Sequence, residues 1–184
     1  MRSRNLLRSV VLGGAIGACA LLSQAEPVDV SAEQGMVSLV RLTPQQYARS
    51  VRDLFGDSIE VKDNKVAPGF RDEGLLALGT RKLTIGSAEM EQYEKLAQDI
   101  ARQVVDPDRR ATVLPCKPKS ETAADVSCAG PFLKQVGMYL FRRPLTESEL
   151  QMYIATHQAG AEKLGTFNAG LAAALSQMLV APDF

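Results

Sequence analysis

Two short stretches of the chain mark the starts of helices. TPQQ at residues 43–46 combines a hydroxyl that caps a helix, a proline suited to the first helical position and a glutamine suited to the third. TESE at residues 146–149 repeats this capping box with a glutamate at the third position. Because a capping box satisfies backbone donors that a helix start leaves unpaired, each stretch predicts a helix directly behind it.

Apolar residues recur at helical spacing along much of the chain, and no segment shows the alternation typical of a strand. We therefore predict an all-α fold, an irregular helical domain of about five helices with long loops in its first half. Ser87 is expected to cap the second helix, and either Ser127 or Asp125 the third. The residues expected to face the core are Tyr47, Val51, Leu54, Phe55, Met90, Tyr93, Leu96, Ala97, Ile100, Val104, Phe132, Leu133, Val136, Tyr139, Leu140, Leu150, Tyr153, Ile154, Phe167, Leu171, Leu175, Met178 and Leu179.

The first 25 residues have the order of a secretory signal peptide. Three arginines precede an uncharged apolar run at residues 10–22, and small residues follow at 23 and 25. We expect residues 1–25 to be removed and residues 26–40 to form a linker, which makes the mature chain periplasmic or secreted. An alternative interpretation is a lipoprotein signal, in which Cys19 is lipidated. The apolar run is too short for a transmembrane helix, which needs about 20 residues.

The charge of the chain argues against nucleic acid as a partner. The signal peptide carries three of the 21 basic residues and none of the 21 acidic ones, so the mature chain has 18 basic residues against 21 acidic ones, a net charge of −3. Its basic residues are scattered among acids, whereas binding of nucleic acid requires a concentrated basic surface.

Two cysteines remain after removal of the signal peptide. Cys116 and Cys128 flank a loop rich in lysine, proline and serine, and in an oxidising compartment such a pair predicts a disulfide. A metal site would need further ligands, but His157 is the only histidine and no Cys-x-x-Cys spacing occurs. We expect no metal and no cofactor in this chain.

Arg142 and Arg143 lie between an apolar helical run and Pro144, just before the capping box that starts at Thr146. One interpretation is structural: the arginines complement the carbonyl end of one helix, and an ion pair to Glu147 or Glu149 spans the turn to the next. The other is an anion site, in which the arginines and the first amides of the following helix hold a carboxylate or sulfate. We favour a structural joint with no catalytic residue.

His157 is the one side chain with the pKa of a general base near neutral pH. No serine or cysteine is marked as its nucleophile by the local sequence, so packing against a neighbouring helix or exposure at the surface is the favoured interpretation. An enzymatic role would require Arg142, Arg143, Tyr153 and His157 to surround one open pocket.

Several stretches resemble known modules of large secreted bacterial proteins. LTPQQYARSVRDLFGD at 42–57 is similar to the domain of unknown function 1587. CAGPFLKQVGMYLFRRPLTESELQMY at 128–153 and FNAGLAAALSQMLVAPDF at 167–184 resemble the modules numbered 1595 and 1592. The resemblance implies a helical module over 41–105, a proline- and cysteine-containing loop over 106–127 and a second helical module over 128–184.

The family resembled here is also called planctomycete cytochrome-like, because many of its members carry a c-type haem domain on the same polypeptide. This chain has no Cys-x-x-Cys-His, so the resemblance implies haem only elsewhere in full-length relatives. It further implies that relatives continue beyond the residue matching Phe184, and that this chain is an amino-terminal fragment. The partners implied are the remaining modules of a longer polypeptide or a redox partner protein.

These observations lead to three hypotheses about function. The favoured one is an exported, non-catalytic helical fragment of a large periplasmic or cell-surface protein whose relatives are linked to c-type cytochromes. The second is a part of a cell-envelope enzyme that acts on extracellular polymers. The third is a docking module for a separate cytochrome, which predicts an acidic surface patch.

Overall fold

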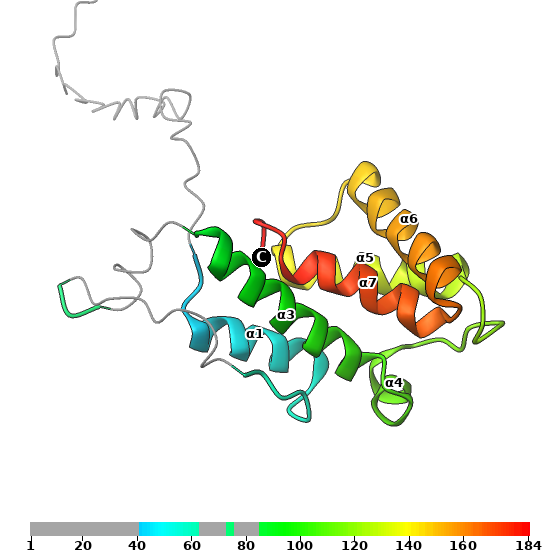
Figure 1. The fold of residues 1–184 in the computed structure, drawn as a ribbon, viewed down its shortest axis with the longest axis horizontal. Helices are drawn as coiled ribbons and strands as arrows, with labels where there is room; N and C mark the ends of the chain where they lie inside the picture. The colour runs from blue at the N-terminus through cyan, green and yellow to red at the C-terminus, as the bar shows by residue number, and fades with distance from the viewer. Residues whose placement is uncertain (1–40, 63–72, 76–84) are drawn as a thin grey trace, which may run out of the picture. The chain divides into compact units, whose positions relative to one another are not determined.

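The computed structural model describes residues 41–62, 73–75 and 85–184, all of which fall in one unit of the chain, Ser38–Phe184. The predicted signal peptide (1–25), the linker (26–40) and the lipidation candidate Cys19 lie outside the described residues. Within them the chain is helical and contains no β-strand, which confirms the predicted fold class (Figure 1). The helices are α1 (Pro44–Phe55), α3 (Ser87–Val104), α4 (Pro107–Val113), α5 (Val126–Phe141), α6 (Glu147–Leu164) and α7 (Phe167–Leu179).

One of these helices, α4, was not expected. It occupies the beginning of the segment predicted as a loop over 106–127. The Asp106 carboxylate caps it by accepting from the Asp108 amide at 3.1 Å, and Pro107 takes the first helical position. Asp106 and Pro107 can end the preceding helix, but the same two residues also suit the start of a new one. The described part therefore holds six helices instead of about five.

The predicted caps form with one shift. In α1, Thr43 Oγ1 accepts from the Gln46 amide at 3.2 Å, while Gln46 Oε1 accepts from the Thr43 amide at 2.8 Å. Thr146 makes the corresponding box at the start of α6. Asp125, and not Ser127, caps α5. The residue at the cap of α3 is Gly86, so Ser87 is the first helical residue and the prediction there is wrong by one position.

Helix α7 lies at the centre of the helical packing. It contacts α3, α5 and α6, and so connects α3 from the first part of the chain with the later helices α5 and α6 (Figure 1). Its apolar residues recur every three to four positions and are buried along its whole length, as the sequence predicts for a helix surrounded by others. The buried residues of α7 are Phe167, Gly170, Leu171, Ala174, Leu175, Met178 and Leu179.

Helices α6 and α7 cross at very short range. A Cβ atom on Gly160 would stand 3.0 Å from the Gly170 Cα, and a Cβ atom on Gly170 would stand 2.3 Å from the His157 carbonyl oxygen. Only residues without side chains allow two helical backbones to approach this closely. The two glycines therefore fix the distance between the helices.

Two residues predicted to face the core do not. Tyr139 on α5 is 60 % exposed, and Met90 at the start of α3 is 37 % exposed. The remaining apolar residues of these helices follow the prediction, with Leu133 and Ile100 fully buried. The exceptions lie near helix ends, where the neighbouring elements no longer cover the whole apolar face.

Candidate functional site

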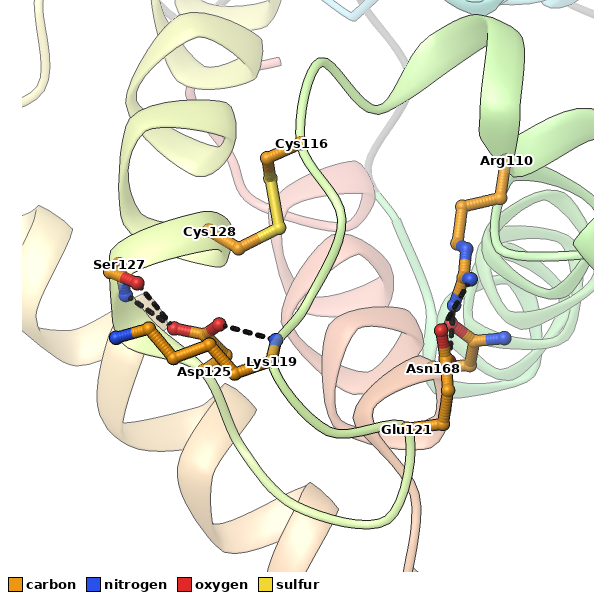
Figure 2. The surroundings of a disulfide bond; sticks show 8 residues. All are labelled: Arg110, Cys116, Lys119, Glu121, Asp125, Ser127, Cys128 and Asn168. Atoms are coloured by element: carbon orange, nitrogen blue, oxygen red, sulfur yellow. Dashed lines mark hydrogen bonds and ion pairs between the residues drawn. A yellow bond between two sulfur atoms is a disulfide. The ribbon is translucent and has the colours of Figure 1, made fainter.

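The disulfide joins the loop after α4 to the first turn of α5. Cys116 and Cys128 are bonded (Figure 2). Their Cα atoms lie 5.6 Å apart, and the two residues are 12 positions apart in sequence. Cys128 is buried against the core and Cys116 packs on it from the loop. The predicted pairing is confirmed, and it holds an otherwise irregular segment onto the helices.

Asp125 organises the same loop by hydrogen bonds. Its carboxylate accepts from the Ser127 hydroxyl at 2.6 Å, from the Ser127 amide at 3.0 Å and from the Lys119 amide at 2.9 Å (Figure 2). The Ser127 hydroxyl and the Lys119 amide lower the pKa of Asp125 to about 2, because both donors favour the ionised form. The carboxylate thus remains charged and continues to cap α5 at all ordinary pH values.

A second polar contact ties α4 and the loop to the start of α7. The guanidinium of Arg110 donates to both carboxylate oxygens of Glu121, at 2.6 and 2.7 Å, and to Asn168 Oδ1 at 2.5 Å (Figure 2). The Phe167 amide donates to the Glu121 carbonyl at 2.9 Å. These bonds and the disulfide together hold the loop after α4 against α5 and α7. The polar groups around Cys116 and Cys128 therefore have a structural role.

We call residues 142–146, between α5 and α6, the joint. Arg143 donates two parallel hydrogen bonds to the Glu149 carboxylate, at 2.9 and 2.7 Å, and a third to Asp183 at 2.7 Å. Arg143, followed by the Thr146 amide and hydroxyl, lowers the pKa of Glu149 to about 2. Arg143 therefore links the end of α5, the start of α6 and the segment that follows α7.

Arg142 takes no part in that network. It ends α5 in the left-handed conformation, at φ 55° and ψ 25°, and has no ion-pair partner among the described residues. Its side chain lines a hollow between α1 and α5, of about 500 Å³, together with Asp53 and Tyr139. These side chains are exposed, as in an ordinary solvated groove.

The two neighbouring arginines give a direct test of the joint. We expect Arg143→Met to lower the melting temperature, because Glu149 and Asp183 both lose their partner. Arg142→Met, one residue away and solvent-exposed, serves as the matched control and should melt like the unchanged protein. Thermal unfolding followed by circular dichroism at neutral pH checks both, and equal melting of the two variants would contradict the assignment.

His157 lies in the core between α6 and α7 and is fully buried. Its ring meets the Phe167 ring edge-on, with centroids 5.0 Å apart. Neither ring nitrogen reaches hydrogen-bond geometry with a described residue, although the Gly170 backbone lies near enough to favour the charged form slightly. Burial lowers its pKa from the ordinary value of 6.5, because the charged imidazolium loses its hydration. Of the two interpretations favoured for this residue, packing holds.

This burial predicts a specific dependence of stability on pH. Between pH 6.5 and the lower folded pKa, the unfolded chain binds a proton at His157 that the folded chain does not, so the free energy of unfolding falls as the pH drops, by at most ~1.4 kcal/mol per pH unit. His157→Leu should remove this slope between pH 6.5 and 5. Urea unfolding of both proteins across that range provides the measurement.

Between pH 6.5 and 5 the change in the free energy of unfolding comes from His157, because it is the only histidine of the chain. Asp125 and Glu149 have ordinary values of 3.8 and 4.5, and both are lowered on folding. Their contribution to stability is lost only as the pH falls below those ordinary values. Equal slopes for His157→Leu and the unchanged protein would show that the buried imidazole does not control acid sensitivity.

The four residues needed for the enzyme hypothesis do not share a pocket in the described part of the chain. Tyr153 and His157 are buried in the core, while Arg143 is engaged at the joint. Arg142 opens on the hollow between α1 and α5. The arrangement thus gives a substrate no common access to these groups.

A second pocket, which we call the terminal pocket, lies where α1, α3 and the segment after α7 meet. It measures about 460 Å³, and its walls are mostly apolar. Tyr47 anchors one wall: its hydroxyl donates to the Leu179 carbonyl at 3.3 Å, and its ring lies 4.9 Å from the ring of Phe184. Burial raises the pKa of the Tyr47 hydroxyl, so it stays protonated.

Arg41 is the charged residue of the terminal pocket. Its Nε donates to the Tyr93 hydroxyl and its Nη2 to Glu89, both at 3.2 Å, and the guanidinium lies 5.6 Å from the Tyr93 ring centre. Its side chain is only 8 % exposed, and Nη1 has no partner among the described residues. Arg41 directly precedes the first helix and belongs to no sequence motif, so nothing in the sequence marks it as a pocket residue.

The segments that the structure describes contain no side-chain cluster suited to a metal ion and no candidate for a membrane-spanning helix. No group of three or more histidine, cysteine or acidic residues there is placed to hold a metal ion. None of the helices in those segments has both the length and the apolar character needed to cross a membrane.

Comparison with known proteins places two family matches on this fold. No curated protein and no solved structure matches the chain. Residues 41–106, which include α1 and α3, match the family described as protein of unknown function (DUF1587). Residues 128–184, which include most of α5 and all of α6 and α7, match the family described as protein of unknown function (DUF1595). Two segments of the chain thus match family models of unknown function, in the order 1587 then 1595.

Proposed function

We propose that the chain is an exported helical module of a larger cell-envelope protein and that its own role is structural. The observation that carries the proposal is the disulfide between Cys116 and Cys128. Disulfides persist in exported proteins and are rare in the cytosol, where thiols are kept reduced. Residues 1–25 also support export, because a basic start, an apolar run and small residues follow one another as in a signal peptide.

The structural role rests on how the polar side chains are used. Arg143 is bound to Glu149 and Asp183, and Arg110 to Glu121 and Asn168. Charged groups that are fully paired within the fold stabilise one arrangement of helices and leave little capacity for chemistry. The two matched modules support a place within a longer polypeptide.

We further propose that the larger protein takes part in electron transfer. The support for this role is the resemblance to cytochrome-like proteins, in which c-type haem is attached to a different part of the polypeptide. In this proposal the helical module holds neighbouring modules, or a separate redox partner protein, in position and binds no haem itself.

Intact-mass analysis after cell fractionation tests export. We expect the product in the periplasm or medium, with residues 1–25 removed and with two hydrogens fewer than the reduced chain. A diacylated product that begins at Cys19 would support the lipoprotein alternative and still confirm export. An unprocessed cytoplasmic product with free thiols would overturn the proposal.

The larger protein and its redox context need a separate measurement. The mass of the native protein, together with the reading frame beyond the codon for Phe184, should reveal further modules and a Cys-x-x-Cys-His. If further modules are found without such a motif, the proposal that haem is attached to the same polypeptide is wrong. A native product limited to this chain would overturn the larger protein.

A further inference from the structure

The terminal pocket has the size of a small-molecule site. Its volume of about 460 Å³ falls within the range of about 300 to 1,000 Å³ found for ligand pockets. Its described walls come from three separate parts of the chain, represented by Leu42 before α1, Met90 on α3 and Leu179 on α7. Because the pocket forms only when these parts pack together, it is a property of the folded domain.

The large polar side chains of the walls are engaged within the fold. Arg41 is the one charged residue of the described lining, and its Nη2 atom donates to the Glu89 carboxylate at 3.2 Å. Its Nε atom donates to the Tyr93 hydroxyl, and its Nη1 atom is closed off from solvent. The Tyr47 hydroxyl donates to the Leu179 carbonyl. A charged ligand would therefore lose its hydration without an accessible, unpaired group of opposite charge among the described lining residues.

Apolar side chains make up most of the remaining surface. Ile85 and Met90 line the pocket and are 51 % and 37 % exposed, although both are large and apolar. Val180 and Pro182 continue the apolar wall along the segment after α7. An uncharged occupant would remove these surfaces from water, and this removal is the main favourable term for binding in an apolar pocket.

Three aromatic rings gather in the wall of the pocket. Tyr47, Tyr93 and Phe184 all line it. The Tyr47 ring meets the Tyr93 ring edge-on, with centroids 6.0 Å apart, and the Phe184 ring in a tilted contact, with centroids 4.9 Å apart. Aromatic rings favour such edge-on and tilted contacts with one another, so a further ring can join the group in the same way.

From these observations we propose that the terminal pocket binds a small, uncharged aromatic molecule. The ring system of the ligand packs against Tyr47, Tyr93 and Phe184, and Met90 covers it on the side of α3. The ion pair between Arg41 and its carboxylate partner stays intact and takes no direct part in binding. This inference goes beyond the proposed structural role and does not depend on export.

Two fluorescent probes with the same ring skeleton test the proposal on the full chain with its disulfide formed. Phenylnaphthylamine is uncharged, and anilinonaphthalene sulfonate differs from it by one sulfonate group. We expect saturable binding of the uncharged probe, at least about tenfold tighter than binding of the sulfonate, because the sulfonate must give up its hydration. Equal or tighter binding of the sulfonate would overturn the proposal. So would a lack of saturable binding of phenylnaphthylamine, the result expected if another part of the chain fills the pocket.

Two methionine variants locate the site. Met90→Gln keeps the length of the side chain but places an amide against the ligand, and it should weaken binding of phenylnaphthylamine by at least about fivefold. Met138→Gln is the matched control, because Met138 is 46 % exposed on α5 and lies outside the described lining of the pocket. Unchanged binding by Met90→Gln, or equal losses in the two variants, would refute the site. If Met90→Gln does not fold, the order of the two probes on the unchanged protein decides.

Discussion

Gly170→Ala is expected to destabilise the protein by about 3 kcal/mol, at the upper end of the usual cost of overpacking. The added Cβ atom would stand 2.3 Å from the His157 carbonyl oxygen and 2.8 Å from the Ala161 amide nitrogen. Both atoms belong to the backbone of α6, so no side-chain rotation can relieve the contact. The helices must separate, and α7 also packs on α3 and α5. Urea unfolding midpoints provide the measurement.

Gly130→Ala is the matched control for this prediction. Gly130 is also buried within a helix, but the nearest atom to an added Cβ is the Ile154 Cδ1 atom at 3.6 Å, an ordinary contact. Because alanine favours a helix over glycine by about 1 kcal/mol, this variant should be as stable as the unchanged protein or more so. Similar midpoints for the two variants would mean that the close crossing of α6 and α7 does not exist in solution.

Removal of the disulfide by Cys116→Ala with Cys128→Ala is expected to cost roughly 3 kcal/mol, because the crosslink restricts the unfolded chain over a short loop. The loop also anchors α4 and the start of α7 through Arg110 and Glu121. Unfolding in urea should therefore shift to lower concentration for the double variant.

The reduced form of the unchanged protein separates the crosslink from the packing of the sulfur atoms. With a reductant present, it should unfold at nearly the same urea concentration as the double variant. If the oxidised protein and the double variant unfold together, the disulfide contributes no stability. If only the double variant is destabilised, the loss comes from removing the buried Cys128 side chain.

The joint shows how far local sequence information extends. The helix end at Arg142, the turn at Pro144 and the capping box at Thr146 all depend on residues within a few positions of one another, and the structure has them as expected. The ion pair from Arg143 to Asp183 spans 40 positions, and no local pattern indicates it. Of the two adjacent arginines, Arg143 makes this ion pair, while Arg142 ends α5 in the left-handed conformation.

The terminal pocket could not be predicted from the sequence, because it too depends on contacts between distant residues. Met90 and Tyr93 continue the apolar stripe of α3, so periodicity assigns them to the core together with Leu96 and Ile100. Periodicity identifies an apolar face but not the element that covers it. At the start of α3 the covering is incomplete, and the same stripe becomes the wall of a pocket beside Arg41.

The helical class, most helix boundaries, the capping boxes and the cysteine pair can be predicted from the sequence, because they depend on short-range hydrogen bonding, periodic apolar residues and residue chemistry. The partners of Arg143, the burial of His157, the exposure of Tyr139 and the pocket beside Arg41 follow only from the three-dimensional packing. The partners of Arg143, the burial of His157 and the pocket beside Arg41 all involve α7 or the segment that follows it, and α7 packs against α3, α5 and α6. That packing is set by contacts between residues far apart in the chain, which no single segment encodes.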